Sequence, residues 1–384
     1  EILRLEEEPA KVPLGYLTSD NRDNWAQARE ALLQIPGMEN ALETLESGIL
    51  LLCLDEEAPV SRAQCAKLFL HGDGKNRWFD KSIQILVGSN GKAGLLGEHA
   101  MMDGMPMVGL ADHLVKLSYN EVKEKGGNTE NSTNIQNIFE DIDISSNISD
   151  MVEESKDVFE EWTGKHEINV QSFQGYGAKQ IKKMGFSPDA FVQMAMQVGT
   201  YRLFGKQAGT YEATQTRTFL HGRTETTRTV STASSEFLNK FHKDTATSQE
   251  KLQALQAAVS SHGTYIQNAA KGMGVDRHFL GLSLLVKEGE TVPDLFSDPV
   301  YQRSKRWRVS TSNLTHPKFD NWGYGEVVPD GVGLSYSVHP NHCIFSVTSL
   351  EENRFSERLC HHLEEAMMEM RELVEEMGVP QSKL

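Results

Sequence analysis

The sequence predicts an α/β protein with mixed sheets flanked by helices. Short apolar runs of strand length alternate with segments whose apolar residues recur at helical spacing, and this alternation continues along the chain without an internal repeat. The chain has 384 residues, which is more than a single hydrophobic core usually serves. We therefore expect two domains built from strands and helices.

A small sheet and a helix are expected in the first half of the chain. Residues 48–54 form an apolar run that predicts a buried strand, and residues 83–87 predict a second strand whose odd-numbered apolar positions share one face. The Ser-Asn-Gly-Lys sequence at 89–92 is typical of a turn, so residues 93–98 are the expected hairpin partner. Residues 105–117 follow helical spacing, and the loop before them is a place where side chains can face a cleft.

Three helices and a strand are expected in the second half. Ser187, followed by proline and aspartate, is suited to cap one helix. Thr247 and Glu250 form a capping box for another. Residues 354–377 carry an apolar stripe at helical spacing, and residues 309–312 predict a strand that ends in hydroxyl side chains.

The composition argues against several classes of partner. Lys and Arg number 38 against 54 Asp and Glu, and the resulting formal net charge of −16 opposes bulk attraction to nucleic acid or to anionic membranes. Any anionic ligand must therefore bind a local basic cluster. The four cysteines are scattered without metal-ligand spacing, which predicts a reducing context and no metal site. We interpret the polar segment 125–150 as a solvated loop or a connection between domains.

His99 and Asp103 are the candidate catalytic pair, in the sequence His-Ala-Met-Met-Asp-Gly at residues 99–104. An imidazole has an unperturbed pKa of about 6.5, so at neutral pH it can accept a proton from a hydroxyl or a thiol. The carboxylate four residues later can hold the local turn through charge-assisted hydrogen bonds. Taken alone, these six residues fit a structural histidine as well as a general base.

Both ends of the sequence suggest a context. The chain opens on Glu1 without a methionine or a signal sequence, so we expect a fragment of a longer protein. Its last residues, Ser382, Lys383 and Leu384, match a peroxisomal address that an import receptor reads. A mitochondrial address in an unseen upstream segment stays open.

Several longer motifs, in this order along the chain, resemble the choline/carnitine acyltransferase family. The resemblance extends from about residue 14 to residue 377, and the short-chain carnitine members from fungi are the nearest likeness. The motifs that carry it are Asn-Arg-Trp-Phe-Asp-Lys at 76–81, the histidine motif at 99–104, Ser-Pro-Asp-Ala-Phe at 187–191, Gly-Arg-Thr-Glu-Thr at 222–226 and Pro-Asp-Gly at 329–331.

The resemblance implies a two-domain, chloramphenicol-acetyltransferase-like fold and reversible transfer of a short acyl group between coenzyme A and the hydroxyl of carnitine. Residues 1–145 would be the C-terminal portion of the first domain, which carries the catalytic histidine and lacks its upstream part. Residues 146–384 would be the second domain, with the carnitine and coenzyme A contacts. His99 falls on the catalytic histidine of the family, and Ser312 falls on the serine that supports the tetrahedral oxyanion. Asp103 falls on an acidic position that orients the histidine, and a loop-fixing salt bridge is an equal alternative.

The resemblance also assigns the residues that bind carnitine. Tyr211, Thr224 and Arg277 fall on the positions that bind the carboxylate of carnitine, and an arginine with two hydroxyls suits a planar anion. Choline has no carboxylate, so these residues favour carnitine. Tyr324 lies where the family usually places phenylalanine against the trimethylammonium group, and its ring retains the cation–π attraction. Ser310 is a further candidate near that position.

Coenzyme A requires cations for its phosphates. The cluster of Lys179, Lys182 and Lys183 just precedes the helix that begins after Ser187, and Lys182 aligns with a coenzyme A lysine of the family. Lys179 lies one residue away from the other family lysine, and a solvated lysine run is the alternative interpretation. Ser187 and Asp189, in the same motif, are assigned to coenzyme A as well. No permanently bound cofactor is implied.

Trp322 stands where long-chain members of the family have a glycine, so its side chain is expected to close the acyl channel and favour short acyl groups. The alternatives are a medium-chain carnitine acyltransferase and an inactive fragment of the family. The resemblance places the activity in fatty-acid metabolism and the transport of acyl groups. It leaves peripheral association with an organelle membrane open.

Overall fold

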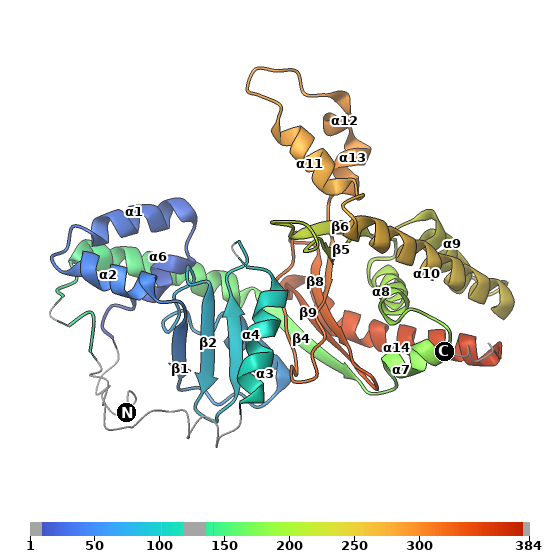
Figure 1. Ribbon diagram of the computed structural model, residues 1–384, viewed down its shortest axis with the longest axis horizontal. Helices are drawn as coiled ribbons and strands as arrows, with labels where there is room; N and C mark the ends of the chain where they lie inside the picture. The colour runs from blue at the N-terminus through green and yellow to red at the C-terminus, as the bar shows by residue number, and fades with distance from the viewer. Residues whose placement is uncertain (1–9, 101, 118–135, 141, 379–384) are drawn as a thin grey trace. The chain divides into compact units, whose positions relative to one another are not determined.

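The computed structural model describes residues 10–100, 102–117, 136–140 and 142–378 (Figure 1). The chain divides into two compact units, Glu1–Lys165 and His166–Leu384. Residues 125–135 and 141 of the polar segment expected to be a loop lie outside the described residues, as does the tripeptide Ser382-Lys383-Leu384. The loop prediction is wrong for residues 146–150, which begin helix α6 (Ser146–Gly164). No described helix is long and apolar enough to cross a membrane.

The helices and strands of each unit alternate along the chain. The first unit contains η2 (Leu14–Ser19), α1 (Arg22–Leu32), α2 (Met38–Ser47), β1 (Leu51–Asp55), α3 (Arg62–Leu70), β2 (Ile83–Gly88), β3 (Ala93–Gly97), α4 (Gly104–Lys116) and α6 (Ser146–Gly164). The second unit contains β4 (His166–Phe173), α7 (Ala178–Lys183), α8 (Pro188–Phe204), β5 (Thr210–Gln215), β6 (Thr224–Arg228), α9 (Thr232–Phe241), α10 (Ser248–Ala270), α11 (Asp276–Leu284), α12 (Asp294–Ser297), α13 (Pro299–Ser304), β7 (Val309–Asn313), β8 (Val332–Val338), β9 (Cys343–Leu350), η3 (Glu351–Asn353) and α14 (Phe355–Glu376). The α/β class is therefore confirmed.

The first unit has a three-stranded sheet in the order β1-β2-β3. Strand β1 runs parallel to β2, and β2 pairs with β3 as the expected antiparallel hairpin. The chain leaves β3 at Gly97, so His99 lies in the loop that connects this strand to α4. This is the position that the sequence predicted for it.

One burial prediction for this sheet is wrong, and the two faces of β2 differ in burial. The apolar run at 48–54 is not a buried strand, because β1 lies at the sheet edge and Leu52 is half exposed. In β2 the odd-numbered apolar residues are only partly buried, whereas Gln84 and Leu86 on the opposite face are buried. The Gln84 side chain is satisfied there because its Oε1 accepts the backbone N–H of Trp78 at 3.1 Å.

Helix α6 belongs to the first unit. Its inward residues Ile148, Val152 and Phe159 pack in one core with Tyr16 of η2, and Ser155 donates a hydrogen bond of 2.9 Å to Asp20. The compact units therefore divide after Lys165, at the end of α6, whereas the domain boundary expected from the sequence lies just before that helix.

The second unit is built on a six-stranded mixed sheet in the order β4-β9-β8-β7-β5-β6. Strands β5, β7 and β8 are parallel neighbours, and the flanking pairs β5–β6, β8–β9 and β9–β4 are antiparallel. The sheet therefore has the mixed character that the sequence predicted. The carnitine-subsite candidates on β5, β6 and β7 lie on neighbouring strands.

Three helices of the second unit pack together, α8, α10 and α14. The predicted capping box of Thr247 and Glu250 is present at the start of α10, and the predicted apolar stripe of α14 is buried. Helix α8 starts at Pro188 as expected, but the Ser187 side chain makes no capping hydrogen bond. Helix α8 is buried on nearly all sides, and its Gln193 donates hydrogen bonds to Thr311 and Tyr336 at 2.9 Å.

Helices α11, α12 and α13 form an arm, residues 276–304, that stands away from the sheet of this unit (Figure 1). None of the residues in these helices is fully buried. The sequence motif Asp276-Arg277 begins α11, so Arg277 lies at the base of the arm, close to strand β6.

Candidate active site

His99 is held by the loop that follows β3. Its Nδ1 lies 2.9 Å from the carbonyl oxygen of Met102. A carbonyl oxygen can only accept a hydrogen bond, so this contact places the proton on Nδ1 and gives Nε2 the lone pair of the neutral ring. The His99 side chain is 77% exposed. The local geometry therefore suits a base whose accepting atom is Nε2.

Asp103 precedes the first turn of α4 and is its N-cap residue. Its Oδ1 lies 3.8 Å from Nδ1 of His99, which is within the range of an ion pair and too long for a hydrogen bond. The carbonyl of Met102 therefore makes the closer contact and fixes the orientation of the ring. The expected pairing of His99 and Asp103 is present as this longer contact.

The structure brings Tyr211, Thr224 and Arg277 together. Nη2 of Arg277 donates to the Tyr211 hydroxyl at 3.2 Å and to Thr224 Oγ1 at 3.3 Å, and Nε donates to the Thr224 carbonyl at 3.1 Å. The Arg277 side chain is exposed, so the guanidinium can meet a ligand from solution. A guanidinium beside two hydroxyls is a suitable set of donors for a carboxylate.

Tyr324, Ser310 and Trp322 form a second group in this unit. The Tyr324 hydroxyl donates to the carbonyl oxygen of Ser310 at 2.9 Å, and its ring lies 5.6 Å from that of Trp322. Burial raises the pKa of the Tyr324 hydroxyl well above its usual value. The hydroxyl, which a phenylalanine at this position would lack, is therefore hydrogen-bonded to the backbone of β7. This bond uses the edge of the ring and leaves its face for other contacts. Ser310 itself is buried.

Ser312 lies two residues further along β7 and is half-buried. No hydrogen-bond partner of its hydroxyl is present among the residues that the structure describes. Trp322 is fixed by its indole N–H, which donates to the Tyr336 carbonyl at 3.2 Å.

The lysine cluster lies on α7 and borders a pocket of about 450 Å³. Lys179 and Lys183, one helical turn apart, line the pocket together with Arg371 and Glu375 of α14, whereas Lys182 does not. Gly177 also lines the pocket, and a side chain does not fit there because a Cβ would lie 2.2 Å from the His339 carbonyl. Arg371 is a basic residue of this pocket that the sequence reasoning missed.

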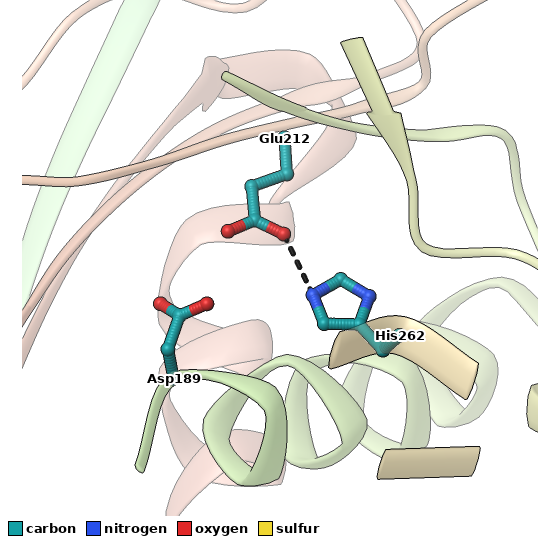
Figure 2. A group of neighbouring side chains, drawn as sticks. All are labelled: Asp189, Glu212 and His262. Atoms are coloured by element: carbon teal, nitrogen blue, oxygen red, sulfur yellow. Dashed lines mark ion pairs between the residues drawn. The ribbon is translucent and has the colours of Figure 1, made fainter. Parts of the chain in front are cut away.

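Asp189 does not border this pocket but points into a buried group with Glu212 and His262 (Figure 2). Asp189 Oδ1 accepts hydrogen bonds from the Tyr336 hydroxyl at 2.7 Å and from Asn313 at 2.9 Å. Glu212 Oε2 lies 2.8 Å from His262 Nε2. The expectation that Asp189 contacts coenzyme A therefore stays a prediction, and its visible contacts are within the protein. Ser187 does not border the pocket either.

The buried group has perturbed pKa values. Burial, with the negative charge of Asp189, raises the pKa of Glu212 to about 7. Burial opposes the charged form of His262, but the hydrogen bond and charge of Glu212 outweigh it and raise the pKa of the imidazole. The ligand atoms of the three residues lie within 4.8 Å of one another, a spacing that could hold a cation. The Glu212–His262 ion pair already accounts for this proximity, so we assign no metal to it.

Sequence reasoning missed Glu212 and His262. A signal for Glu212 exists in the alternation of β5, where a carboxylate occupies the inward position between Tyr211 and Ala213. His262 lies on α10, and nothing local to its position indicates a carboxylate partner 50 residues earlier in the chain.

The fold and these residues define an α/β protein with an exposed histidine, a guanidinium–hydroxyl group suited to a carboxylate, and a basic pocket. A sequence model described as choline/carnitine O-acyltransferase matches residues 1–365. The chain belongs to this family.

Relatives support the assignment. The mitochondrial carnitine O-acetyltransferase of Saccharomyces cerevisiae is 35% identical over 99% of this chain and 58% of its own length. The carnitine O-acetyltransferase of Columba livia is 32% identical over 97% of this chain and 61% of its length, and the mitochondrial carnitine O-palmitoyltransferase 2 of Mus musculus is 34% identical over 95% and 56%. The chain thus spans about three fifths of the length of these relatives.

Proposed function

We propose that this chain takes part in the reversible transfer of a short acyl group between coenzyme A and the hydroxyl of carnitine. The observation that carries the proposal is the group of Arg277, Tyr211 and Thr224, whose donors converge as a carboxylate requires. Carnitine has a carboxylate and choline does not. This group therefore favours carnitine within a family that uses both alcohols.

The role that we propose for His99 follows from its tautomer, in which Nδ1 carries the proton and Nε2 can accept one. Nε2 accepts the proton of the carnitine hydroxyl as the oxygen attacks the carbonyl carbon of the thioester. A tetrahedral oxyanion forms, the carbon–sulfur bond breaks, and the same proton passes to the sulfur of coenzyme A. In the reverse direction the thiol loses its proton to Nε2. Asp103 stabilises the positive charge that the ring carries between these two transfers.

Ser312 and Tyr324 have separate roles in this proposal. The Ser312 hydroxyl donates to the developing oxyanion, an interaction that is strongest in the transition state. The ring of Tyr324 faces the trimethylammonium of carnitine, with Ser310 supporting it through its carbonyl. Both residues act on charges that water would otherwise solvate.

The pocket beside α7 is our proposed site for a phosphate of coenzyme A. Lys179 and Lys183 supply positive charge in a chain whose formal net charge is −16, and Arg371 adds a third cation. Lys182 remains a predicted contact on the exposed surface of the same helix. We likewise propose that the first unit supplies the base and that the second supplies the carnitine and coenzyme A contacts.

The experiment that tests the function is release of free thiol from acetyl-CoA, measured with carnitine, with choline and with neither alcohol. We expect carnitine-dependent release that exceeds the choline rate by at least about tenfold, because the carboxylate donors stay unpaired with choline. Equal rates with both alcohols would contradict the assignment to carnitine. An inactive chain whose longer form is active would support the alternative of an inactive fragment.

Trp322 is the proposed determinant of acyl-chain length. Its indole is held by the Tyr336 carbonyl, and a side chain of this size is expected to leave room for short acyl groups only. We predict that Trp322→Gly increases the octanoyl-to-acetyl ratio of kcat/KM by about tenfold or more, because the space vacated by the indole can accept methylenes. Efficient use of octanoyl-CoA by the unmodified protein would instead favour the medium-chain alternative.

The cellular location stays a prediction. The relative from Saccharomyces cerevisiae is named as mitochondrial, and the tripeptide Ser382-Lys383-Leu384 is the basis for expecting peroxisomes. A fluorescent reporter that carries these three residues at its end is expected to enter peroxisomes, and one without them is not.

A further inference from the structure

Arg228 lies at the base of the arm, residues 276–304, and contacts both of its ends. Its Nε and Nη2 bond both carboxylate oxygens of Asp276 at 2.9 and 2.6 Å, at the start of α11. Its Nη1 donates to the carbonyl of Ser304 at 2.7 Å, at the end of α13. The bonds to Asp276 form a bidentate pair, and both side chains are shielded from solvent, with 23% and 11% of their surface exposed.

The guanidinium of Arg228 also contacts Tyr211 indirectly, through the ring of Trp307. It lies 4.8 Å from the ring of Trp307, and that ring lies 5.7 Å from the ring of Tyr211. Arg228 and Tyr211 are directly opposed partners across the β5–β6 pair. Arg228 therefore connects to Tyr211 both through the sheet and through an aromatic side chain.

Arg277 connects the start of α11 directly to Tyr211 and Thr224. It follows Asp276 in the chain, and its guanidinium bonds the Tyr211 hydroxyl and Thr224. Its backbone N–H donates to Glu225 Oε1 at 3.3 Å, and the same oxygen accepts the N–H of Thr226 at 2.6 Å. Gly274 permits this approach, since a Cβ there would lie 2.4 Å from the Glu225 side chain.

We propose that Arg228 is a positioning residue for the carnitine carboxylate. It fastens both ends of the arm to strand β6 and backs the Tyr211 ring through Trp307, so that Arg277 and Tyr211 keep the separation at which both can donate to one carboxylate. Glu225 assists by fixing the first turn of α11. The role in carnitine binding rests on the proposed function, whereas the fastening of the arm does not.

Binding of a ligand by an exposed arginine such as Arg277 costs conformational entropy, because the backbone and the side chain both lose freedom. The cost is smaller when the backbone is already fixed before the ligand binds. Besides the bonds of Arg228, the hydrogen bonds of Arg277 join the arm to strands β5 and β6, so loss of Arg228 leaves Arg277 with less support at the base of the arm. The expected consequence is specific. Loss of Arg228 weakens the binding of carnitine and leaves the basic pocket on α7 unchanged.

The test compares Arg228→Met with Arg228→Lys and with a matched control, Arg202→Met. Arg202 also forms a bidentate pair, with Glu369 at 2.9 and 2.7 Å, and it joins α8 to α14, helices that carry none of the three residues proposed to bind the carboxylate. Each variant is assayed for the KM of carnitine, the KM of acetyl-CoA and kcat. Hydrogen–deuterium exchange of residues 276–304 is measured without any ligand.

We expect Arg228→Met to raise the KM of carnitine by about tenfold, with the KM of acetyl-CoA and kcat within about twofold of the unmodified protein. Arg228→Lys keeps the charge but loses the bidentate geometry, so we expect its KM of carnitine to lie between that of Arg228→Met and that of the unmodified protein. Amides of the arm exchange faster in Arg228→Met and not in Arg202→Met.

Three results overturn the proposal. The first is a carnitine KM that does not change in Arg228→Met. The second is a parallel rise of both KM values, because that would indicate a general structural defect. The third is unchanged exchange of the arm. If the unmodified protein neither binds nor acylates carnitine, the proposed function and the carnitine role fail together, and the exchange experiment then decides the fastening of the arm independently.

Discussion

His99 and His262 are the same side chain in opposite environments. The His99 side chain is 77% exposed and its Nδ1 is held by a backbone carbonyl, whereas the His262 side chain is 2% exposed and faces Glu212. A catalytic base must meet a substrate and change its protonation state without disturbing the fold. The exposure of His99 is the environment that we expect of such a base. The charge of His262 is coupled to the buried carboxylate of Glu212 and to the half-buried one of Asp189, so a change in its protonation state affects the stability of the protein.

The largest expected effect on stability comes from removing His262. His262→Ala leaves the Glu212 carboxylate buried beside Asp189 without its cationic partner, and we expect the free energy of unfolding to fall by about 3–5 kcal/mol. His99→Ala removes an exposed side chain and is expected to change it by about 0.5 kcal/mol or less. Urea denaturation of both variants measures the difference. Equal stabilities would contradict the distinction between the two histidines.

The next effect is a pH dependence of stability. The pKa of Glu212 is raised to about 7 and that of His262 is also raised, so the folded protein holds these protons more tightly than the unfolded chain does. Stability conferred by the bound protons is present at low pH and is lost as the pH rises through the folded-state pKa values. We expect a loss of about 1–3 kcal/mol between pH 5 and pH 8.

Glu212→Gln tests this pH dependence. An amide at this position does not titrate, so the slope of unfolding free energy against pH should flatten in the variant. Denaturation curves at a series of pH values provide the measurement. An unchanged slope would assign the pH dependence to other groups.

The smallest effect is expected at Asp103. Its carboxylate lies 3.8 Å from His99 Nδ1, and the Met102 carbonyl already holds the ring. We expect Asp103→Asn to lower kcat/KM by less than about tenfold, because a partly exposed charge at this separation is screened by solvent. Steady-state kinetics with carnitine and acetyl-CoA decide the point. A loss of a thousandfold would show that Asp103 is as essential as the histidine itself.

Features with local causes could be predicted from the sequence. The turn between β2 and β3 predicted that His99 follows a strand, and the capping box of Thr247 with Glu250 predicted the start of α10. Both features depend on residues only a few positions apart in the sequence. The apolar stripe of α14 also follows from local periodicity. The family motifs named Tyr211, Thr224 and Arg277, and the structure brings these three together.

Features that depend on distant partners could not be predicted. The burial of Gln84 on β2 could not be predicted, because the partners of its side chain include Cys53 of the neighbouring strand β1 as well as the Trp78 backbone. The packing of α6 on the core of the first unit could not be predicted, because a polar composition does not reveal it. The role of Arg228 could not be predicted because its partners Asp276 and Ser304 lie 48 and 76 residues further along the chain.

The central claim is that the chain transfers acyl groups to carnitine with His99 as the base. The most direct measurement is carnitine-dependent thiol release from acetyl-CoA by the unmodified protein and by His99→Gln, with equal stability of the two verified by denaturation. We predict a rate about 10²–10⁴-fold lower in His99→Gln, which is the usual contribution of a general base. Thiol release by His99→Gln at the unmodified rate would contradict the account.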